Sequence, residues 1–542
     1  MIRDEEAEKR SHEQEARRPN ILLILNDDMG YSDIGCYGGE VDTPFLNQLA
    51  EQGLRFTQFY NTARCSPSRA SLLTGLHPHQ TGIGVLVDDD GPEGYQGNLN
   101  KQCVTIAEVL RQAKYRTYMS GKWHIANNIS EVTDTWPLQR GFDRYYGTLA
   151  GSGNFYYPST LTRDNENIEH EALNKDYYYT DAISDEAVRF IKEHVEEYPD
   201  TPFFQYVAYT APHWPLHAKE DDIAKYKDRF NAGWDQLRIE RMQRMQEMGI
   251  LNAGWSLTDR DNSQPAWEDA AHKEWEQRRM EVYAAQIDSM DQGIGRILQT
   301  LEETGQLEQT LILFLSDNGG CAEEFEPVQP NKIPKNWGRT STGADVAFGN
   351  RPDVMPGAET TFQSYGTAWA NLSNTPFRLY KHWVHEGGIA TPFIVHWPEA
   401  IQSKGEIRHM ACQLTDVMAT ILDITNAAYP ATYNGHAICP PEGKSMKKFF
   451  VSDDHAEDRF LFWEHEGNAA VREGNWKLVK NYPGKWELFD MAQDRTEIYN
   501  LADQYPERVQ QMIVQYDRWA TRCGVKPREK ILEIIAKRNR RK

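Results

Sequence analysis

Two unbroken apolar runs, each ending in acidic residues, constrain the fold more than any other feature of the sequence. The first run is Asn20–Leu25, which leads into Asn26-Asp27-Asp28, and the second is Thr310–Leu315, which leads into Ser316-Asp317-Asn318. A near-continuous apolar run is typical of a parallel strand that is covered on both faces. Both runs are therefore predicted to be central strands of a parallel sheet, with polar residues at their carboxyl ends.

Further predicted strands and helices alternate between these two runs. The strands are Tyr115–Met119 and Pro202–Tyr209, and the helices are Thr105–Ala113 and Asp185–Tyr198. This alternation predicts an α/β fold with a doubly wound, mostly parallel sheet flanked by helices. Residues 219–297 are helical in pattern and are expected to pack around its core. Ligands of such sheets bind beyond the carboxyl ends of the strands, so both acidic ends should lie at one rim.

The C-terminal part of the chain has a different pattern. Short antiparallel strands and a closing helix are predicted there: Phe460–Glu464, Ala469–Glu473, Trp476–Lys480 and Pro506–Cys523. We therefore expect an α/β domain over residues 19–450, followed by a small C-terminal α+β domain over residues 451–542.

Charge and hydropathy exclude two classes of partner. The formal net charge is -21, and because a phosphate backbone selects basic surfaces, no nucleic-acid partner is expected. No apolar run approaches the roughly 20 residues of a membrane span, so none is predicted. The charged segment Met1–Arg18 lacks the apolar stretch of a secretory signal. The chain as written is expected to be cytoplasmic, or periplasmic or secreted if a signal peptide was removed.

The polar strand ends form a candidate metal site. Asp27, Asp28, Asp317 and Asn318 offer only oxygen ligands, which suit Ca²⁺ or Mg²⁺. Asp and Asn also favour turns and helix N-caps, so either pair alone is equally consistent with a structural role. Two acidic pairs at the ends of two parallel strands favour the metal. The seven cysteines have no close CxxC pair and signal neither zinc nor a disulfide framework.

Basic residues are expected near the same rim. Lys122 and His124 follow one predicted strand, His213 follows another, and Lys381 lies in a Tyr-Lys-His-Trp segment. A lone His is more often a hydrogen-bonded structural residue, and a lone Lys is usually solvated. The position of Lys122, His124 and His213 after predicted strands is what makes those three residues candidates for function at the rim.

One further segment identifies a family. Cys65–Gly75, with the sequence CSPSRASLLTG, resembles the signature of type I sulfatases, whose cysteine is oxidised after synthesis to formylglycine, or 3-oxoalanine. Five other motifs of that family occur in its order: Asp-Asp, Gly-Lys-Trp-His, Pro-His-x-Pro, Asp-Asn-Gly and Glu-Gly-Gly. The likeness extends from Asn20 to Leu501 and is closest to bacterial arylsulfatases. It implies an alkaline-phosphatase-like fold and a sulfuric ester hydrolase.

The resemblance implies a nucleophile and a metal. Cys65 would become 3-oxoalanine, whose hydrate is a geminal diol; one hydroxyl attacks sulfur, and the other later expels sulfate as the aldehyde re-forms. A divalent cation, Ca²⁺ in preference to Mg²⁺, would lower the pKa of the attacking hydroxyl. Its ligands would be Asp27, Asp28, Asp317, Asn318 and the modified Cys65.

The family also implies roles for the basic residues. Arg69 and Lys122 would position the formylglycine, and His124 would take the proton that triggers sulfate release. His213 and Lys381 would bind sulfate and protonate the leaving oxygen. Three carboxylates around one divalent cation leave a charge of -1, so Arg69, Lys122 and Lys381 are needed to attract a sulfate anion.

The resemblance implies a small-molecule or saccharide sulfate ester as substrate, and a maturation enzyme that reads the C-x-P-x-R segment at Cys65 before folding. Aryl sulfates are the leading substrate class, with sulfated carbohydrates as the main alternative. A phosphate or phosphonate monoester hydrolase would keep the same metal site. A binding protein that lost catalysis would not be expected to keep all six catalytic candidates: Cys65, Arg69, Lys122, His124, His213 and Lys381.

The aromatic patches at Phe155-Tyr156-Tyr157, Tyr177-Tyr178-Tyr179 and Trp369 are expected to belong to the core in preference to a substrate pocket.

Overall fold

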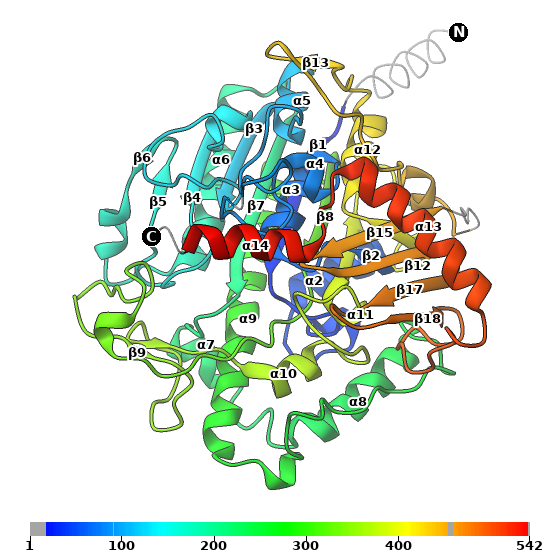
Figure 1. The fold of residues 1–542 in the computed structure, drawn as a ribbon. Helices are drawn as coiled ribbons and strands as arrows, with labels where there is room; N and C mark the ends of the chain where they lie inside the picture. Colours follow the sequence, from blue (N-terminus) through cyan, green and yellow to red (C-terminus); the bar gives the residue numbers. More distant parts are fainter. Residues whose placement is uncertain (1–17, 90, 454–458, 540–542) are drawn as a thin grey trace.

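A ten-stranded sheet crosses the molecule in the computed structural model, which describes residues 18–89, 91–453 and 459–539 (Figure 1). The strand order is β12-β2-β11-β8-β1-β7-β3-β4-β5-β6. The strands are β1 (Asn20–Asp27), β2 (Leu54–Tyr60), β3 (Arg116–Gly121), β4 (Arg144–Thr148), β5 (Leu161–Arg163), β6 (Glu166–Asn167), β7 (Phe203–Pro212), β8 (Thr310–Ser316), β11 (Ala390–His396) and β12 (Ile407–Gln413).

The centre of the sheet is parallel, as the sequence predicts. β8, β1, β7, β3 and β4 run in one direction, and every residue of β1, β7 and β8 is buried. The predicted strands Tyr115–Met119 and Pro202–Tyr209 correspond to β3 and β7. β11 lies antiparallel between β2 and β8, which the local pattern does not predict. The mostly parallel α/β fold is confirmed.

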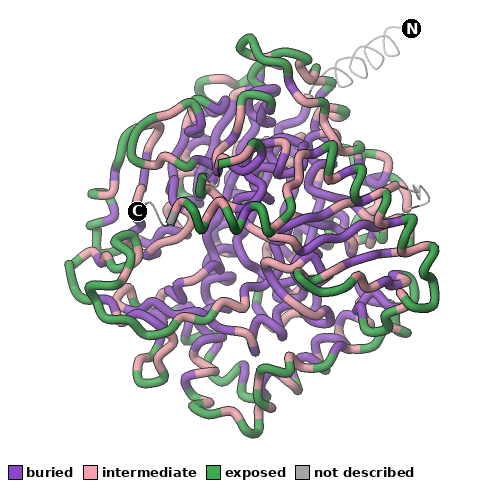
Figure 2. The backbone as a smooth tube through the Cα atoms, in the orientation of Figure 1, coloured by how far each residue is buried: buried purple, intermediate pink, exposed green. Residues whose placement is uncertain are grey.

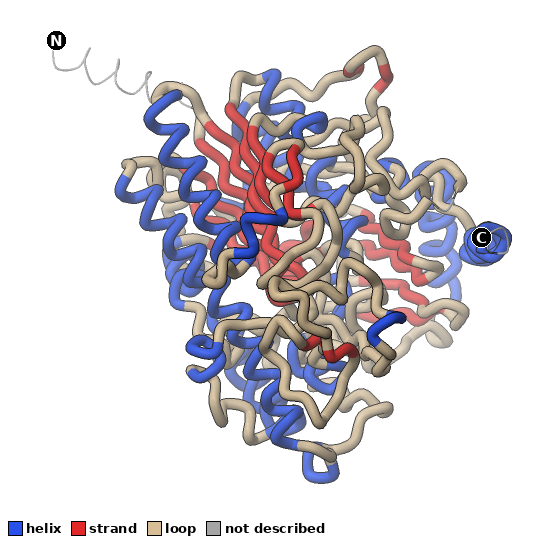
Figure 3. The backbone as a smooth tube through the Cα atoms, turned by 90° about the vertical axis from the view of Figure 1, so that its left-hand side faces the viewer, coloured by secondary structure: helices blue, strands red, loops and turns tan. Residues whose placement is uncertain are grey.

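Helices cover both faces of the sheet (Figure 3). On β1, Leu22 and Ile24 face the core layer that includes α6 and α9, whereas Leu23 and Leu25 face the layer that includes α3, α5 and α12. The helices are α2 (Pro44–Gln52), α3 (Cys65–Thr74), α4 (Pro78–Thr81), α5 (Ile106–Gln112), α6 (Tyr179–Glu197), α7 (Glu220–Ala224), α8 (Gly233–Glu247), α9 (Lys273–Glu303), α10 (Gly366–Ser373), α11 (Glu386–Ile389) and α12 (Thr415–Thr425).

Two helical predictions differ from the structure in extent. α6 begins at Tyr179, six residues before the predicted start, because Tyr179 and Ile183 bury on the same face as the rest of the helix. Residues 219–297 are expected to be largely helical, but the segment between α8 and α9 is mostly loop. α9 itself packs against α6 and β7, which confirms that this region surrounds the core.

A separate four-stranded antiparallel sheet forms near the C-terminus (Figure 1). Ala469, Leu478 and Leu488 pack against α13 on one face of this sheet, whereas the alternate residues Ala470 and Val479 face the main core. Its elements are β15 (Phe460–His465), β16 (Asn468–Glu473), β17 (Trp476–Lys480), β18 (Trp486–Asp490), α13 (Pro506–Cys523) and α14 (Arg528–Asn539). The predicted small C-terminal α+β unit is confirmed, with β18 as an additional strand. The boundary at residue 450 stays a prediction.

The buried backbone is concentrated in the two sheets and the helices beside them (Figure 2). Two further pairs of short strands lie outside: β9 (Ala347–Phe348) with β10 (Thr361–Phe362), and β13 (Thr432–Tyr433) with β14 (His436–Ala437). Within the described residues, no helix has the length and apolar character needed to cross a membrane. The charged segment before Arg18, on which the expected compartment depends, lies outside the described residues.

Candidate active site

The carboxyl ends of β1 and β8 bring three carboxylates and one amide together. The two strands are parallel neighbours in register, so the residues that follow them meet at one rim. The backbone N–H of Asp28 donates to Asp317 Oδ1 at 3.2 Å, and Asn318 Nδ2 donates to Asp28 Oδ1 at 2.7 Å. These residues and Asp27 are each at most 1% exposed. Such closely spaced buried carboxylates require compensating positive charge.

Arg69 and Lys122 supply part of that charge. Arg69 Nη2 lies 3.2 Å from Asp27 Oδ2 and 3.0 Å from Asp317 Oδ2, while Lys122 Nζ donates to Asp27. Burial opposes ionisation of Asp27, but Lys122, His213 and Arg69 together hold its pKa below the usual range. Burial and the nearby Asp27 carboxylate raise the pKa of Asp317 to about 8. The carboxylates therefore favour a further cation at neutral pH.

Lys381 and His213 lie on the other side of the carboxylates. Lys381 Nζ donates to Asp28 Oδ2 at 2.8 Å and lies 3.4 Å from His213 Nε2. His213 Nδ1 donates to the carbonyl of Trp214 at 2.6 Å, so a neutral ring turns its Nε2 lone pair toward Lys381. Burial lowers the pKa of His213 to about 4, which keeps the imidazole neutral at pH 7.

Cys65 is the first residue of α3 and faces His124. Its Sγ lies 3.5 Å from His124 Nδ1, and Cys65 is 3% exposed. The His124 backbone has a φ of +54°, and its ring fills the space where a Cβ on Gly151 would lie 2.2 Å away. Burial, followed by Lys122 and Arg69, keeps the pKa of His124 well below its usual value. His124 is therefore neutral and able to accept a proton beside residue 65.

Two buried oxygens in the site have no partner among the described residues. They are Oδ1 of Asp27 and Oδ1 of Asn318, and each is inaccessible to solvent. A buried polar atom without a hydrogen bond costs about 1–3 kcal/mol, so such atoms call for a ligand. Oxygen donors from carboxylates and an amide are the set that Ca²⁺ and Mg²⁺ prefer. The residues therefore fit a divalent cation held by Asp27, Asp28, Asp317 and Asn318.

The structure thus brings together all the site residues that the sequence predicts. It also places beside them an ion pair, Arg64 with Glu323, that the sequence does not predict. Arg64 Nη1 pairs with Glu323 Oε1 at 3.0 Å, and Glu323 Oε2 accepts from Trp214 Nε1 at 2.8 Å. The side chains of Arg64 and Glu323 are 20% and 33% exposed. The one sequence signal for them is position, because Arg64 precedes Cys65 and Trp214 follows His213.

The predicted aromatic patches are largely structural. Phe155, Tyr178, Tyr179 and Trp369 are at most 2% exposed, in agreement with the expectation of core. The aromatic ring beside the site is instead Trp214, whose centroid lies 4.2 Å from that of His213. Trp214 also packs against a small aromatic cluster that includes β9 and β10. Trp214 is partly exposed, so its ring is accessible beside His213.

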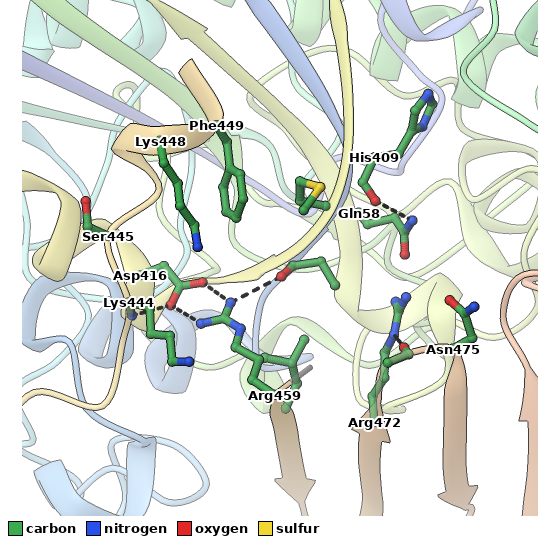
Figure 4. Close-up of a pocket in the computed structure, with 14 residues that line it drawn as sticks. Gln58, His409, Asp416, Lys444, Ser445, Lys448, Phe449, Arg459, Arg472 and Asn475 are labelled. Carbon is green, nitrogen blue, oxygen red and sulfur yellow. Dashed lines mark hydrogen bonds and ion pairs between the residues drawn. The ribbon is translucent and has the colours of Figure 1, made fainter. Parts of the chain in front are cut away.

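A cavity of about 270 Å³ lies away from these residues, between β12 and the C-terminal sheet (Figure 4). Asp416 lies at its wall and accepts hydrogen bonds from the guanidinium of Arg459, while Arg472 donates to the carbonyl of Gly474. None of the predicted site residues lines it. It is therefore separate from the candidate active site.

Comparisons with known proteins agree with the geometry. The family model described as "Sulfatase" matches residues 19–427, and a model described as "N-sulphoglucosamine sulphohydrolase, C-terminal" matches residues 377–518. An uncharacterized sulfatase of Schizosaccharomyces pombe is 31% identical, over 94% of this chain and 95% of that protein. An arylsulfatase of Klebsiella aerogenes is 33% identical, over 76% of this chain and 88% of that protein.

A solved structure shows that the fold also agrees with that of a known protein. Ps i-CgsB in complex with k-i-k-neocarrahexaose superposes with a TM-score of 0.65 and 25% identity, over 93% of both chains. The family match covers most of the chain, including the segment with Cys65 and both acidic strand ends. The chain belongs to the sulfatase family, in the alkaline phosphatase superfamily, and is a sulfuric ester hydrolase.

Proposed function

We propose that the protein hydrolyses sulfate monoesters with a nucleophile made from Cys65 by oxidation to 3-oxoalanine, in a site that holds Ca²⁺. The observation that carries this proposal is the position of Cys65, which starts a buried helix and faces His124 at 3.5 Å. The maturation enzyme would act on the C-x-P-x-R segment before folding, because residues 65–74 are all buried in the folded protein.

The cation site supports the same proposal through its charge. Asp27, Asp28 and Asp317 carry three negative charges when ionised, and Arg69, Lys122 and Lys381 carry three positive ones. A bound divalent cation would supply Lewis acidity to the nucleophile and would bind a sulfate oxygen. The site then has an excess positive charge of two, which suits an anionic sulfuryl group during transfer.

Arg69 and Lys122 are proposed to hold the nucleophile in place. Arg69 spans the site, because Nη1 donates to the carbonyl of Lys122 at 3.0 Å while Nη2 contacts two carboxylates. Neither side chain is exposed, so neither moves freely between rotamers. His124, neutral and beside residue 65, is proposed to remove the proton that allows sulfate to leave.

Lys381 and His213 are proposed to act at the leaving oxygen. The Lys381 ammonium has protons that it can donate to the leaving oxygen. His213 has only its Nδ1–H, which donates to the carbonyl of Trp214. Asp28 favours the charged form of Lys381 and, despite burial, keeps its pKa well above the usual value. In this protonation state Lys381 is the donor that faces the leaving group. His213 Nε2 would orient the ammonium and accept from it.

The alcohol side of the substrate is proposed to be an aryl group, with a sulfated sugar as the second candidate. The partly exposed ring of Trp214, which lies beside His213, suits a planar leaving group. The second candidate is favoured by the solved relative in complex with k-i-k-neocarrahexaose, an oligosaccharide, and by the hydrogen-bonding pair of Arg64 and Glu323 at the rim.

The test compares kcat/KM for nitrophenyl sulfate, nitrophenyl phosphate and a sulfated oligosaccharide, with calcium present throughout. We expect both sulfate esters to exceed the phosphate ester. A clear preference for the phosphate would contradict the proposal and favour a phosphate monoester hydrolase of the same superfamily. The ratio between the aryl sulfate and the oligosaccharide decides the substrate class.

A further inference from the structure

A second group of potential metal ligands lies between the segment that follows Lys381 and the C-terminal sheet. It consists of His382, His465 at the end of β15, and Glu466 in the β15–β16 turn. One ligand atom from each of the three residues lies within 4.8 Å of those of the other two. His382 Nδ1 and His465 Nε2 lie 2.9 Å and 3.7 Å from Glu466 Oε2. Three nitrogen and oxygen donors at this spacing can share one ion.

The fold holds these residues together from two sides. The His382 backbone N–H donates to the carbonyl of Ala63 at 2.7 Å, which ties it to the segment before Cys65. Asn468 Nδ2, at the start of β16, donates to the His382 carbonyl at 3.2 Å. Because these contacts join residues more than 80 positions apart, the cluster is a product of the tertiary fold and is preformed in it.

His465 gives an independent indication of a ligand. It is 1% exposed, and neither of its ring nitrogens has a hydrogen-bond partner among the described residues. Glu466 Oε2 lies 3.7 Å from its Nε2, which is beyond hydrogen-bonding distance. Burial keeps the pKa of His465 well below its usual value, so the ring is neutral and has a lone pair to offer. A buried neutral imidazole without a partner is a costly arrangement that a bound ion would relieve.

The Glu466 carboxylate is held by a hydrogen bond to one of its oxygens, as metal-bound carboxylates commonly are. Arg528, at the start of α14, donates to Oε1, which leaves Oε2 facing the two imidazoles. An outer hydrogen bond of this kind fixes the orientation of a metal-bound carboxylate. In the structure Oε2 accepts from His382 Nδ1 at 2.9 Å. A metal bound at Nδ1 requires the neutral tautomer of His382 that carries its proton on Nε2, so binding moves the ring proton from Nδ1 to Nε2.

We infer that His382, His465 and Glu466 form a binding site for a divalent transition-metal ion of the Zn²⁺ type. Two imidazoles and one carboxylate are characteristic ligands of such ions, in contrast to the all-oxygen set at Asp27 and Asp317. The side chains of His382 and Glu466 are 33% and 21% exposed, so an ion has a path from solvent and keeps an open coordination position. The bound ion would link the C-terminal sheet to His382, the residue that follows Lys381.

Isothermal titration calorimetry tests this inference on the full-length protein saturated with calcium, which keeps the oxygen site filled. Zn²⁺ is expected to bind with a stoichiometry of one. Titration with Co²⁺ is expected to give the visible absorption of a four-coordinate nitrogen and oxygen site.

Two variants remove single ligands. His465→Leu deletes no hydrogen bond and should fold normally, and Glu466→Gln keeps the shape of the side chain. Each is expected to weaken Zn²⁺ binding by more than about tenfold, the lower bound for losing even an outer hydrogen-bond partner of a metal ligand. His170→Leu, at an exposed histidine outside the cluster, is the matched control and should bind as the unmodified protein does. Failure of Zn²⁺ to bind, or binding by either ligand variant that equals that of the unmodified protein, would overturn the inference.

Discussion

Replacing Lys381 by methionine removes the cation beside Asp28 while keeping an unbranched side chain of similar length. In the native protein Nζ lies 2.8 Å from Asp28 Oδ2, and both side chains are 2% exposed. Breaking one partner from a buried ion pair costs about 3–5 kcal/mol, because the other charge stays buried without compensation. Asn318 Nδ2 still donates to Asp28 at 2.7 Å, so we expect a loss near the lower end, about 3 kcal/mol.

Calcium should restore part of this loss. The ion binds the folded protein only, and at one hundred times its dissociation constant it adds about 2.7 kcal/mol to the free energy of unfolding. The effect of calcium should be larger for Lys381→Met than for the unmodified protein, since the variant has one positive charge fewer beside the carboxylates. Turnover should nevertheless fall by about 10²–10³ in kcat, the usual cost of deleting one group that stabilises transition-state charge.

Urea unfolding with and without calcium, together with aryl sulfate kinetics, measures both effects. Lys225→Met is the matched control, because Lys225 pairs with Asp222 at 2.8 Å but is 45% exposed. We expect the control to lose at most about 1 kcal/mol and to keep full activity. A folded Lys381→Met with native kcat, or one that calcium fails to stabilise, would refute the assignment of this lysine and of the neighbouring cation site.

Three further predictions follow from the site and the core. Cys65→Ala should fold with native stability and have no measurable sulfatase activity, and turnover by this variant would contradict the nucleophile. Removing divalent ions with a chelator should abolish turnover by the unmodified protein, and added Ca²⁺ should restore it; activity that survives chelation would contradict the metal. Burial lowers the pKa of His217 to about 4, so the unfolded chain binds a proton at this residue more readily than the folded protein does. The free energy of unfolding should therefore fall as the pH drops from about 6.5 toward 4. The loss from this residue should be about 2 kcal/mol at pH 5. Urea unfolding at pH 7 and pH 5 should show a smaller loss in His217→Gln, and an equal loss would refute that linkage.

The central strands and the site rim were predictable because they depend on local pattern. Asn20–Leu25 and Thr310–Leu315 are apolar at every position except their first, a pattern typical of a strand buried on both faces. Neighbouring parallel strands place the residues that follow them at one rim. The family signature then distinguished Cys65 from six other cysteines, which composition alone could not do.

The features that the sequence did not predict depend on contacts between distant segments. β11 enters the sheet antiparallel between β2 and β8, and no local pattern encodes which strands it will pair with. Arg64 meets Glu323 across 259 positions, and His382 meets Glu466 only because the β15–β16 turn packs on the main domain. Charged residues of this kind look like ordinary surface residues until the fold places them together.

The chemical state of residue 65 tests the central claim most directly. Protein from the native host, digested and analysed by mass spectrometry, should give a peptide around Cys65 in which an aldehyde oxygen replaces the thiol sulfur and two hydrogens are lost. The same peptide should react with a hydrazide probe that labels aldehydes. An unmodified thiol at this position in active enzyme would contradict the proposed nucleophile.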